Sequence, residues 1–310
     1  MVKTANAAAE SIRPLYMNGL SGRMIKLPPP RGKRREILLI SGHHTSIERI
    51  FGLAEYLNRY GGVTSPDLPG FGGMDPFHKI GEKPTLDNMA DYLAAFVKLR
   101  YKKNRRFTIM AVSYGFSVAT RMLQKYPDIA KRVDALVSIS GYTHKADFRW
   151  KKSSILLLGG AAWTVSFAPM SFFVKHTLLR APVIKLLYRA AEKRHPKLKG
   201  VGNEERDERI NFEIKLWRIN DLRTYTYVSS RGFRMVPAKK HVDLVVHHVA
   251  IEDDHYFDNL LVEEHMRTIY KDFVLVKTKL PVHAPTVLAT PKDVAPFVPP
   301  KIRALLRRQP

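Results

Sequence analysis

The stretch FTIMAVSYGFSVAT, residues 107–120, most constrains how this chain folds. It begins with a six-residue apolar run typical of a buried strand, then turns so that Ser113 lies between the small residues Ala111 and Gly115. A strand that turns sharply into a helix needs small residues there and holds the serine in a strained backbone. The Ser113 hydroxyl should therefore project from the end of a strand, and the N–H of Tyr114 should point to where an oxyanion forms.

Strand-like and helix-like patterns alternate along the chain. The predicted strands are Arg23–Pro28, Glu36–Ser41, Phe107–Val112 and Val133–Ser140, and the predicted helices are Ser46–Tyr60, Thr85–Arg100, Tyr114–Tyr126 and Asn259–Tyr270. Apolar residues recur with the helical period in Thr85–Arg100, whereas Val133–Ser140 is mostly apolar, as buried parallel strands are. This alternation predicts an α/β protein whose mostly parallel sheet is covered by helices on both faces. Binding sites in such sheets lie at the carboxyl ends of the strands.

The composition fits one large globular unit. A chain of 310 residues with 45% hydrophobic residues can bury a full core. The absence of cysteine excludes disulfides, thiolate zinc sites and a cysteine nucleophile. Residues 1–16 hold a short alanine run interrupted by Glu10 but no apolar core of a secretory signal, so we expect a cytoplasmic location.

The chain is strongly basic, with 52 Lys and Arg against 28 Asp and Glu. The excess gathers in clusters at 31–35, 98–106, 151–152, 191–199 and 303–308. Such a field attracts anionic lipid headgroups and nucleic acid, although solvated helix faces give the same pattern. No zinc-finger spacing, RNP-type aromatic motif or helix-turn-helix signal accompanies the charge, so nucleic acid is not an expected partner. Peripheral association with an anionic membrane surface stays open.

The segment Ile155–Val174 carries no charge over twenty residues, and Lys151, Lys152 and Lys175 flank it. Its length is enough for a membrane span. Glycine, proline and several hydroxyl residues interrupt it, and a span would place the two halves of the predicted sheet on opposite sides of a bilayer. Three interpretations stay open: a soluble helical cap with an apolar inner face, a cap that dips into the lipid interface, and a true span. Within this region, Glu192–Arg209 is predicted as a charged surface loop.

Further motifs follow the predicted strands in a fixed order. They are SGHH at 41–44, DLPGFGG at 67–73, AVSYG at 111–115, AIEDDHYFD at 250–258 and PVHAP at 281–285. Together they resemble the α/β-hydrolase superfamily, in particular its capped, esterase-like serine hydrolases. In that family the five correspond to the loop after the third strand, the Asp-x-Pro-Gly-x-Gly loop, the nucleophile elbow, the acid loop and the histidine loop.

The resemblance covers Ser21–Tyr142 and Ile219–Val298 and implies the α/β-hydrolase fold with an inserted helical cap. It divides the chain into an N-terminal tail (1–20), a first half of the hydrolase core (21–142), the cap (143–218) and a second half of the core (219–310).

The resemblance also implies a catalytic triad. A serine hydroxyl is a poor nucleophile at neutral pH, so it needs an imidazole to accept its proton and a carboxylate to orient that imidazole. The family order is serine, acid, histidine, which selects Ser113, Asp254 and His283. The neighbouring Asp253 stays as the alternative acid. The remaining histidines of this half, His247, His248, His255 and His265, are interpreted as structural.

The implied oxyanion hole uses the backbone N–H groups of His43 and Tyr114. The loop departs from the family pattern, because Ser41 replaces the usual histidine and His44 adds a second imidazole after the glycine. His44 either lines the site or packs the loop.

These features predict a serine hydrolase that cleaves a small hydrophobic carboxylic ester through an acyl-enzyme. No metal and no organic cofactor is implied. Serine at the elbow disfavours epoxide-hydrolase and dehalogenase chemistry, which normally uses a carboxylate nucleophile. The alternatives are a carbon–carbon bond hydrolase with the same triad and a non-catalytic protein of this fold that binds an anionic membrane surface.

Overall fold

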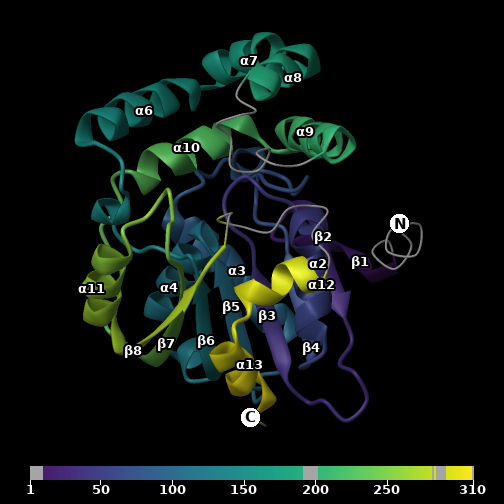
Figure 1. Cartoon of the computed structure of the whole chain (residues 1–310), viewed down its shortest axis with the longest axis vertical. Coiled ribbons are helices and arrows are strands. Elements are labelled where there is room, and N and C mark those ends of the chain that lie inside the picture. Colours follow the sequence, from purple (N-terminus) through teal and green to yellow (C-terminus); the bar gives the residue numbers. More distant parts are fainter. Residues whose placement is uncertain (1–9, 191–201, 281–282, 284–290, 309–310) are drawn as a thin grey trace.

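The computed structural model describes residues 10–190, 202–280, 283 and 291–308. An eight-stranded sheet forms its centre, in the order β1-β2-β4-β3-β5-β6-β7-β8 (Figure 1). The strands are β1 (Ile12–Met17), β2 (Leu20–Leu27), β3 (Glu36–Ile40), β4 (Gly62–Pro66), β5 (Phe107–Val112), β6 (Val133–Ile139), β7 (Val242–Ile251) and β8 (Tyr270–Thr278). The strands from β4 to β8 pair in parallel, and β2 joins β4 antiparallel. The predicted fold class is confirmed.

The N-terminal end of the sheet corrects one prediction. Residues 12–17, predicted as part of a tail, form β1 and pair antiparallel with β2. The hairpin turns at Asn18 and Gly19, both of which have positive φ, so this register is fixed by a tight turn. The apolar residues Leu15 and Met17 are buried, which attaches the strand to the core.

Helices cover both faces of the sheet. They are α2 (Ile47–Asn58), α3 (Leu86–Arg100), α4 (Tyr114–Lys125), α5 (Pro127–Ala130), α11 (Asn259–Ile269), α12 (Pro291–Val294) and α13 (Pro300–Arg307), with short 3-10 helices η1 (Phe77–Ile80), η2 (Lys145–Asp147) and η3 (Ala295–Phe297). Alternate residues of β3 enter different cores, because side chains along a strand point to opposite faces. Ile37 and Leu39 pack with α2 and α13, whereas Leu38 and Ile40 pack with α3, α4 and α11.

Local signals set the ends of several helices close to where the sequence predicts them. The Thr85 side chain accepts a hydrogen bond from the N–H of Asn88 and caps α3. The Asp258 carboxylate accepts from the N–H groups of Leu260 and Leu261 and caps α11. Because β3, β5, β6 and β7 run parallel, the loops that follow β3, β5 and β7 come together at the carboxyl edge of the sheet.

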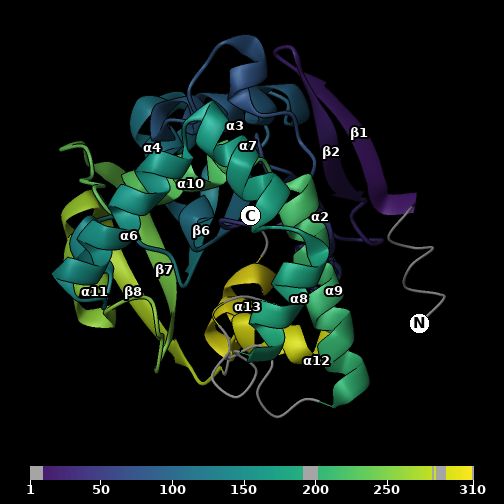
Figure 2. The same cartoon turned by 90° about the horizontal axis from the view of Figure 1, so that it is seen from above.

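A layer of helices lies over this carboxyl edge (Figures 1 and 2). It contains α6 (Lys152–Val165), α7 (Ala168–Thr177), α8 (Ala181–Ala190), α9 (Asn203–Ile219) and α10 (Leu222–Gly232). Figure 2 shows α6 and α7 crossing in front of α10. The layer continues past residue 218, because α10 belongs to it. The predicted surface loop Glu192–Arg209 is wrong over 203–209, which is helical; residues 192–201 lie outside the described part.

The apolar segment Ile155–Val174 does not form an apolar inner face. Many of its large side chains are exposed, including Leu156, Leu157, Phe172 and Phe173. Within the described residues, no single helix is long and apolar enough to cross a bilayer. Only α6 and α7 taken together reach that length and hydropathy, and they bend by 98° where they meet.

Candidate active site

Ser113 occupies a strained turn between β5 and α4. Its φ of 50° and ψ of −123° lie outside the regions that non-glycine residues prefer. The turn is tight because Gly115 lies against the carbonyl oxygen of Ser41, and a Cβ on Gly115 would overlap that oxygen. A hydrogen bond of 2.9 Å from the N–H of Ser113 to the carbonyl of Ile139 fastens the turn to the end of β6. The sequence thus places the Ser113 hydroxyl at the carboxyl edge of the sheet.

Three side chains distant in sequence form one hydrogen-bonded chain at this edge. Nε2 of His283 lies 3.0 Å from Oγ of Ser113. Nδ1 of the same ring lies 2.8 Å from Oδ2 of Asp254. Both distances are those of a hydrogen bond, so the hydroxyl, imidazole and carboxylate are connected in series.

The carboxylate of Asp254 is buried and held in place by the loop after β7. Its Oδ1 accepts a hydrogen bond of 2.8 Å from the N–H of Tyr256. Burial alone would raise the pKa of Asp254, but the hydrogen bonds and the charge of His283 outweigh it, so the pKa lies below its usual value. Asp254 is therefore ionised at neutral pH. The alternative acid, Asp253, is exposed at the mouth of the cavity, so the carboxylate at His283 is that of Asp254.

The loop after β3 lies directly against the Ser113 turn. A Cβ on Gly42 would stand 3.2 Å from the carbonyl oxygen of Val112 and 3.3 Å from Cβ of Ser113. The backbone of His43 is thereby brought beside the serine. Tyr114 is the first residue of α4, and first-turn N–H groups have no acceptor within their own helix. The two predicted oxyanion donors therefore belong to the loop after β3 and to the first turn of α4, which both adjoin Ser113.

The His43 imidazole packs beneath the helical layer. It stacks on Tyr225 of α10 with 4.5 Å between ring centres, and its Nε2 lies 3.1 Å from the Tyr225 carbonyl oxygen. Desolvation lowers the pKa of His43 to about 4, against the opposing effect of that carbonyl. The ring is neutral at pH 7, which suits a role in packing the loop.

His44 contacts a buried ion pair. Arg49 and Glu213, both almost fully buried, pair through Nη2 and Oε1, and Nη1 of Arg49 donates to the His44 carbonyl at 3.2 Å. The His44 ring lies 4.2 Å from the ring of Trp217 and has Nε2 3.9 Å from the Glu213 carboxylate. The ion pair thus ties α2 to α9, and the His44 ring packs the loop after β3 against the same helix.

A cavity of about 360 Å³ connects these groups. The Ser113 hydroxyl opens into it, and so do His283 and Asp254. Its walls are mainly aromatic, formed by Tyr142, Phe148, Trp150, Tyr188, Trp217, Tyr225, Phe233, Tyr256 and Phe257. Most of the surface that a bound molecule would contact is therefore apolar, with Arg49 and Glu213 at one end.

The other histidines of the second half lie away from this chain of hydrogen bonds. His248 is buried on β7, with Nδ1 2.9 Å from Oγ of Ser138. His265 contacts Asp147, and His255 lines the cavity without approaching Ser113 as His283 does.

One group among the described residues has the side chains for a metal ion: His144, Asp147 and His265, with ligand atoms within 4.8 Å of one another. The Asp147 carboxylate already accepts from the N–H groups of Thr143 and His144, and its other oxygen contacts His265. These contacts fix the start of η2 against α11. This structural role explains why the three side chains lie together.

The chain belongs to the α/β-hydrolase fold family. The family's sequence model, described as alpha/beta hydrolase fold, matches residues 37–264. None of the curated protein sequences compared with the chain matches it significantly. The coarser prediction, a hydrolase of this fold, is thereby supported.

Many solved structures share the fold. Cfl2 from Burkholderia cenocepacia is 16% identical, with a TM-score of 0.67 over 96% of this chain and 95% of that one. A membrane phospholipase A described as a bacterial virulence factor is 14% identical, with a TM-score of 0.66 over 98% and 89%. The enol-lactonase from Burkholderia xenovorans LB400 is 11% identical, with a TM-score of 0.64 over 96% and 100%. At these identities the similarity shows the fold and leaves the substrate open.

Sequence reasoning missed the residues that α9 and α10 contribute to the cavity. Glu213, Trp217, Tyr225 and Ser229 belong to no motif. Their helices lie between two segments that the motifs identify, and only a chain that folds back over the sheet brings them to Ser113.

Proposed function

We propose that this protein is a serine hydrolase that cleaves hydrophobic carboxylic esters through an acyl-enzyme. The observation that carries the proposal is the hydrogen-bonded series from Ser113 through His283 to Asp254. The geometry fits the order of roles in this chemistry, because the imidazole of His283 contacts the hydroxyl of Ser113 through one nitrogen and the carboxylate of Asp254 through the other.

In the first step, Oγ of Ser113 attacks the ester carbonyl carbon and Nε2 of His283 takes the hydroxyl proton. Asp254 accepts the N–H at Nδ1 of His283, which keeps Nε2 unprotonated beforehand and stabilises the imidazolium afterwards. The proton then passes from Nε2 to the leaving alcohol. The carbon–oxygen bond to that alcohol breaks, and an acyl group stays on Ser113.

The negative charge that develops on the carbonyl oxygen requires preorganised donors. The N–H groups of His43 and Tyr114 are the candidates, and α4 adds the positive end of its helix dipole beside Tyr114. Losing one such donor typically costs about 3 kcal/mol of transition-state stabilisation. Water, activated by His283, then attacks the acyl carbon, and Ser113 leaves with its proton restored.

The lining of the cavity favours an uncharged, largely apolar substrate. The cavity walls are rich in aromatic side chains, and the buried charges of Arg49 and Glu213 neutralise each other. A charged substrate would have to lose its hydration against these walls, which is costly without a partner. The serine at the elbow also argues against an epoxide as substrate.

A serine-directed fluorophosphonate probe tests the proposal. Wild type should be labelled, Ser113→Ala should not, and the exposed Ser21→Ala variant should be labelled as wild type is. A series of p-nitrophenyl esters of increasing chain length then measures which acyl length the cavity accepts. A wild-type protein that neither labels nor hydrolyses any of these esters would contradict the proposal and favour a non-catalytic role. The carbon–carbon hydrolase alternative stays a prediction.

A further inference from the structure

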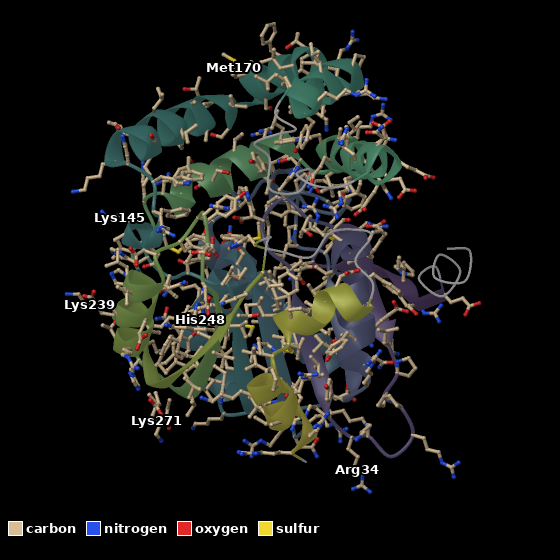
Figure 3. The ribbon with its side chains drawn as sticks, viewed as in Figure 1. Arg34, Lys145, Met170, Lys239, His248 and Lys271 are labelled. Atoms are coloured by element: carbon tan, nitrogen blue, oxygen red, sulfur yellow. The ribbon has the colours of Figure 1, made fainter. Side chains whose placement is uncertain are left out.

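The outward side of α6, α7 and α8 is unusually apolar for a surface in contact with water. Its large exposed side chains are Leu156, Leu157, Leu158, Phe167, Met170, Phe172, Phe173, Leu178, Leu186 and Leu187. Single exposed apolar residues are ordinary, but a continuous group on neighbouring helices marks an interaction surface. In Figure 3, Met170 lies at the outermost end of the molecule, opposite Arg34. We call this group the outer apolar face.

The same segment has charge of one sign only. Residues 151–190 contain six lysines and arginines and no aspartate or glutamate. Lys151 and Lys152 begin α6, while Lys175, Arg180, Lys185 and Arg189 lie on or between α7 and α8. Cationic residues around an apolar helical surface are the pattern of a segment that lies in a membrane interface.

An open groove at the side of the outer apolar face gathers several of these cations. Its lining includes Lys175, His176, Arg180 and Arg218 and no carboxylate among the described residues. The Lys175 ammonium group donates a hydrogen bond of 3.4 Å to the carbonyl of Arg218. Such a site has the charge and the donors to hold a phosphate group.

The helices that carry the outer apolar face are anchored to the layer beneath them. Gly159 lets α6 approach Phe233, the residue that follows α10, and the Arg231 guanidinium lies over the Trp163 ring. On the other side, Ile184 of α8 packs against Ile210 of α9. With α6 and α7 bent by 98°, the pair lies along the surface of the protein and is suited to lie on a bilayer.

We infer that the outer apolar face docks onto a bilayer of anionic phospholipid, with its apolar side chains at the acyl boundary and its cations among the headgroups. The charge decides against a second copy of the chain. Arg189 pairs with Asp207 of α9, but two such faces in contact would still bring together the other cations, and residues 151–190 hold no acidic residue to compensate them. An anionic lipid surface supplies the missing countercharge for the cations that approach it.

Co-sedimentation with vesicles tests this inference. Wild type should bind vesicles of equal parts phosphatidylcholine and phosphatidylglycerol, and should bind pure phosphatidylcholine much more weakly. Raised salt should weaken the binding, because it screens the attraction to the headgroups. Equal binding to both vesicle types, or none to either, would overturn the inference.

Two double variants locate the contact. Phe172→Asp with Phe173→Asp removes apolar area, and we expect the partition coefficient to fall about tenfold or more. Lys175→Glu with Arg180→Glu reverses the charge of the groove, and we expect the partition coefficient to fall about tenfold or more. The controls are Leu260→Asp, on an 80% exposed side chain of α11, and Lys33→Glu with Arg34→Glu at the far end of the molecule.

Both controls should bind within about threefold of wild type if this face makes the contact. A control whose vesicle binding falls as much as that of its matched variant would overturn the inference. So would a protein that self-associates through Phe172 and Phe173 without binding vesicles. Circular dichroism on heating verifies that each variant is folded. Ser113→Ala should bind vesicles as wild type does, so the failure of membrane docking and the failure of the proposed chemistry are distinguishable.

Discussion

Gly115 lies so close to the carbonyl oxygen of Ser41 that no side chain fits between them. This contact joins the Ser113 turn to the loop that carries His43. Gly115→Ala should therefore destabilise the protein by about 1–3 kcal/mol, because the added methyl group forces the two loops apart. Ester hydrolysis should fall with it, since the Ser113 turn and the His43 loop would no longer be held together.

Gly160→Ala is the matched control for this change. Gly160 lies in α6, and a Cβ there meets no atom within 4 Å. Alanine should stabilise the protein by about 0.5–1 kcal/mol because it favours the helix. Urea unfolding measures both variants. Equal effects at the two positions would contradict the role given to the Ser41–Gly115 contact.

The choice of acid is tested by paired variants of neighbouring aspartates. Asp254→Asn should lower kcat for a p-nitrophenyl ester about 10⁴-fold, because the amide no longer holds His283 in the required tautomer. Asp253→Asn should change kcat less than about threefold, since that side chain is exposed and the carboxylate bonded to His283 is that of Asp254. A larger effect at residue 253 would assign the acid role there instead.

The buried pair of Arg49 and Glu213 should be essential for stability. Glu213→Gln leaves the guanidinium of Arg49 without its ionic partner inside the protein, which we expect to cost about 3–5 kcal/mol. Asp243→Asn breaks the exposed pair with Lys271 and should cost less than about 1 kcal/mol. Denaturant unfolding compares the two, and similar losses would show that Glu213 is replaceable.

Acid should destabilise the protein through His248. Desolvation lowers the pKa of His248 to about 4 in the folded state, whereas an unfolded histidine titrates near 6.5. The unfolded chain therefore binds more protons than the folded protein between these two pH values. The contribution of neutral His248 to the free energy of unfolding is complete above about pH 6.5 and is lost as the pH falls towards 4.

His248→Gln measures this contribution, because glutamine can keep the hydrogen bond to Ser138 but does not titrate. Unfolding free energies between pH 7 and 4.5 should fall less steeply in the variant, by up to about 1.4 kcal/mol per pH unit. Parallel curves for wild type and variant would place the acid sensitivity elsewhere, for example at His43, whose pKa is also lowered to about 4.

Local sequence predicted the parts of the site that depend on neighbouring residues. The strand before Ser113 was predicted at its observed bounds because a mostly apolar run ends there in small residues. The order of the motif loops predicted that Asp254 and His283 would lie at the same edge as Ser113. Parallel strands bring the loops that follow them together, so chain order carries this information.

Local sequence alone could not identify what long-range packing decides. Asp253 and Asp254 are adjacent and chemically identical, and only the direction of the loop after β7 determines which one reaches His283. Arg49 and Glu213 are far apart in the chain, and their pairing follows from the way α9 crosses the sheet.

The apolar segment of α6 and α7 shows the same division. The sequence determined that this protein has an α/β-hydrolase core and a long apolar stretch between its halves. Because the stretch is apolar on every side, it carries no periodicity to distinguish an inner face from an outer one. Only the tertiary structure decided that its side chains face outwards, since α9 and α10 already occupy the space above the site.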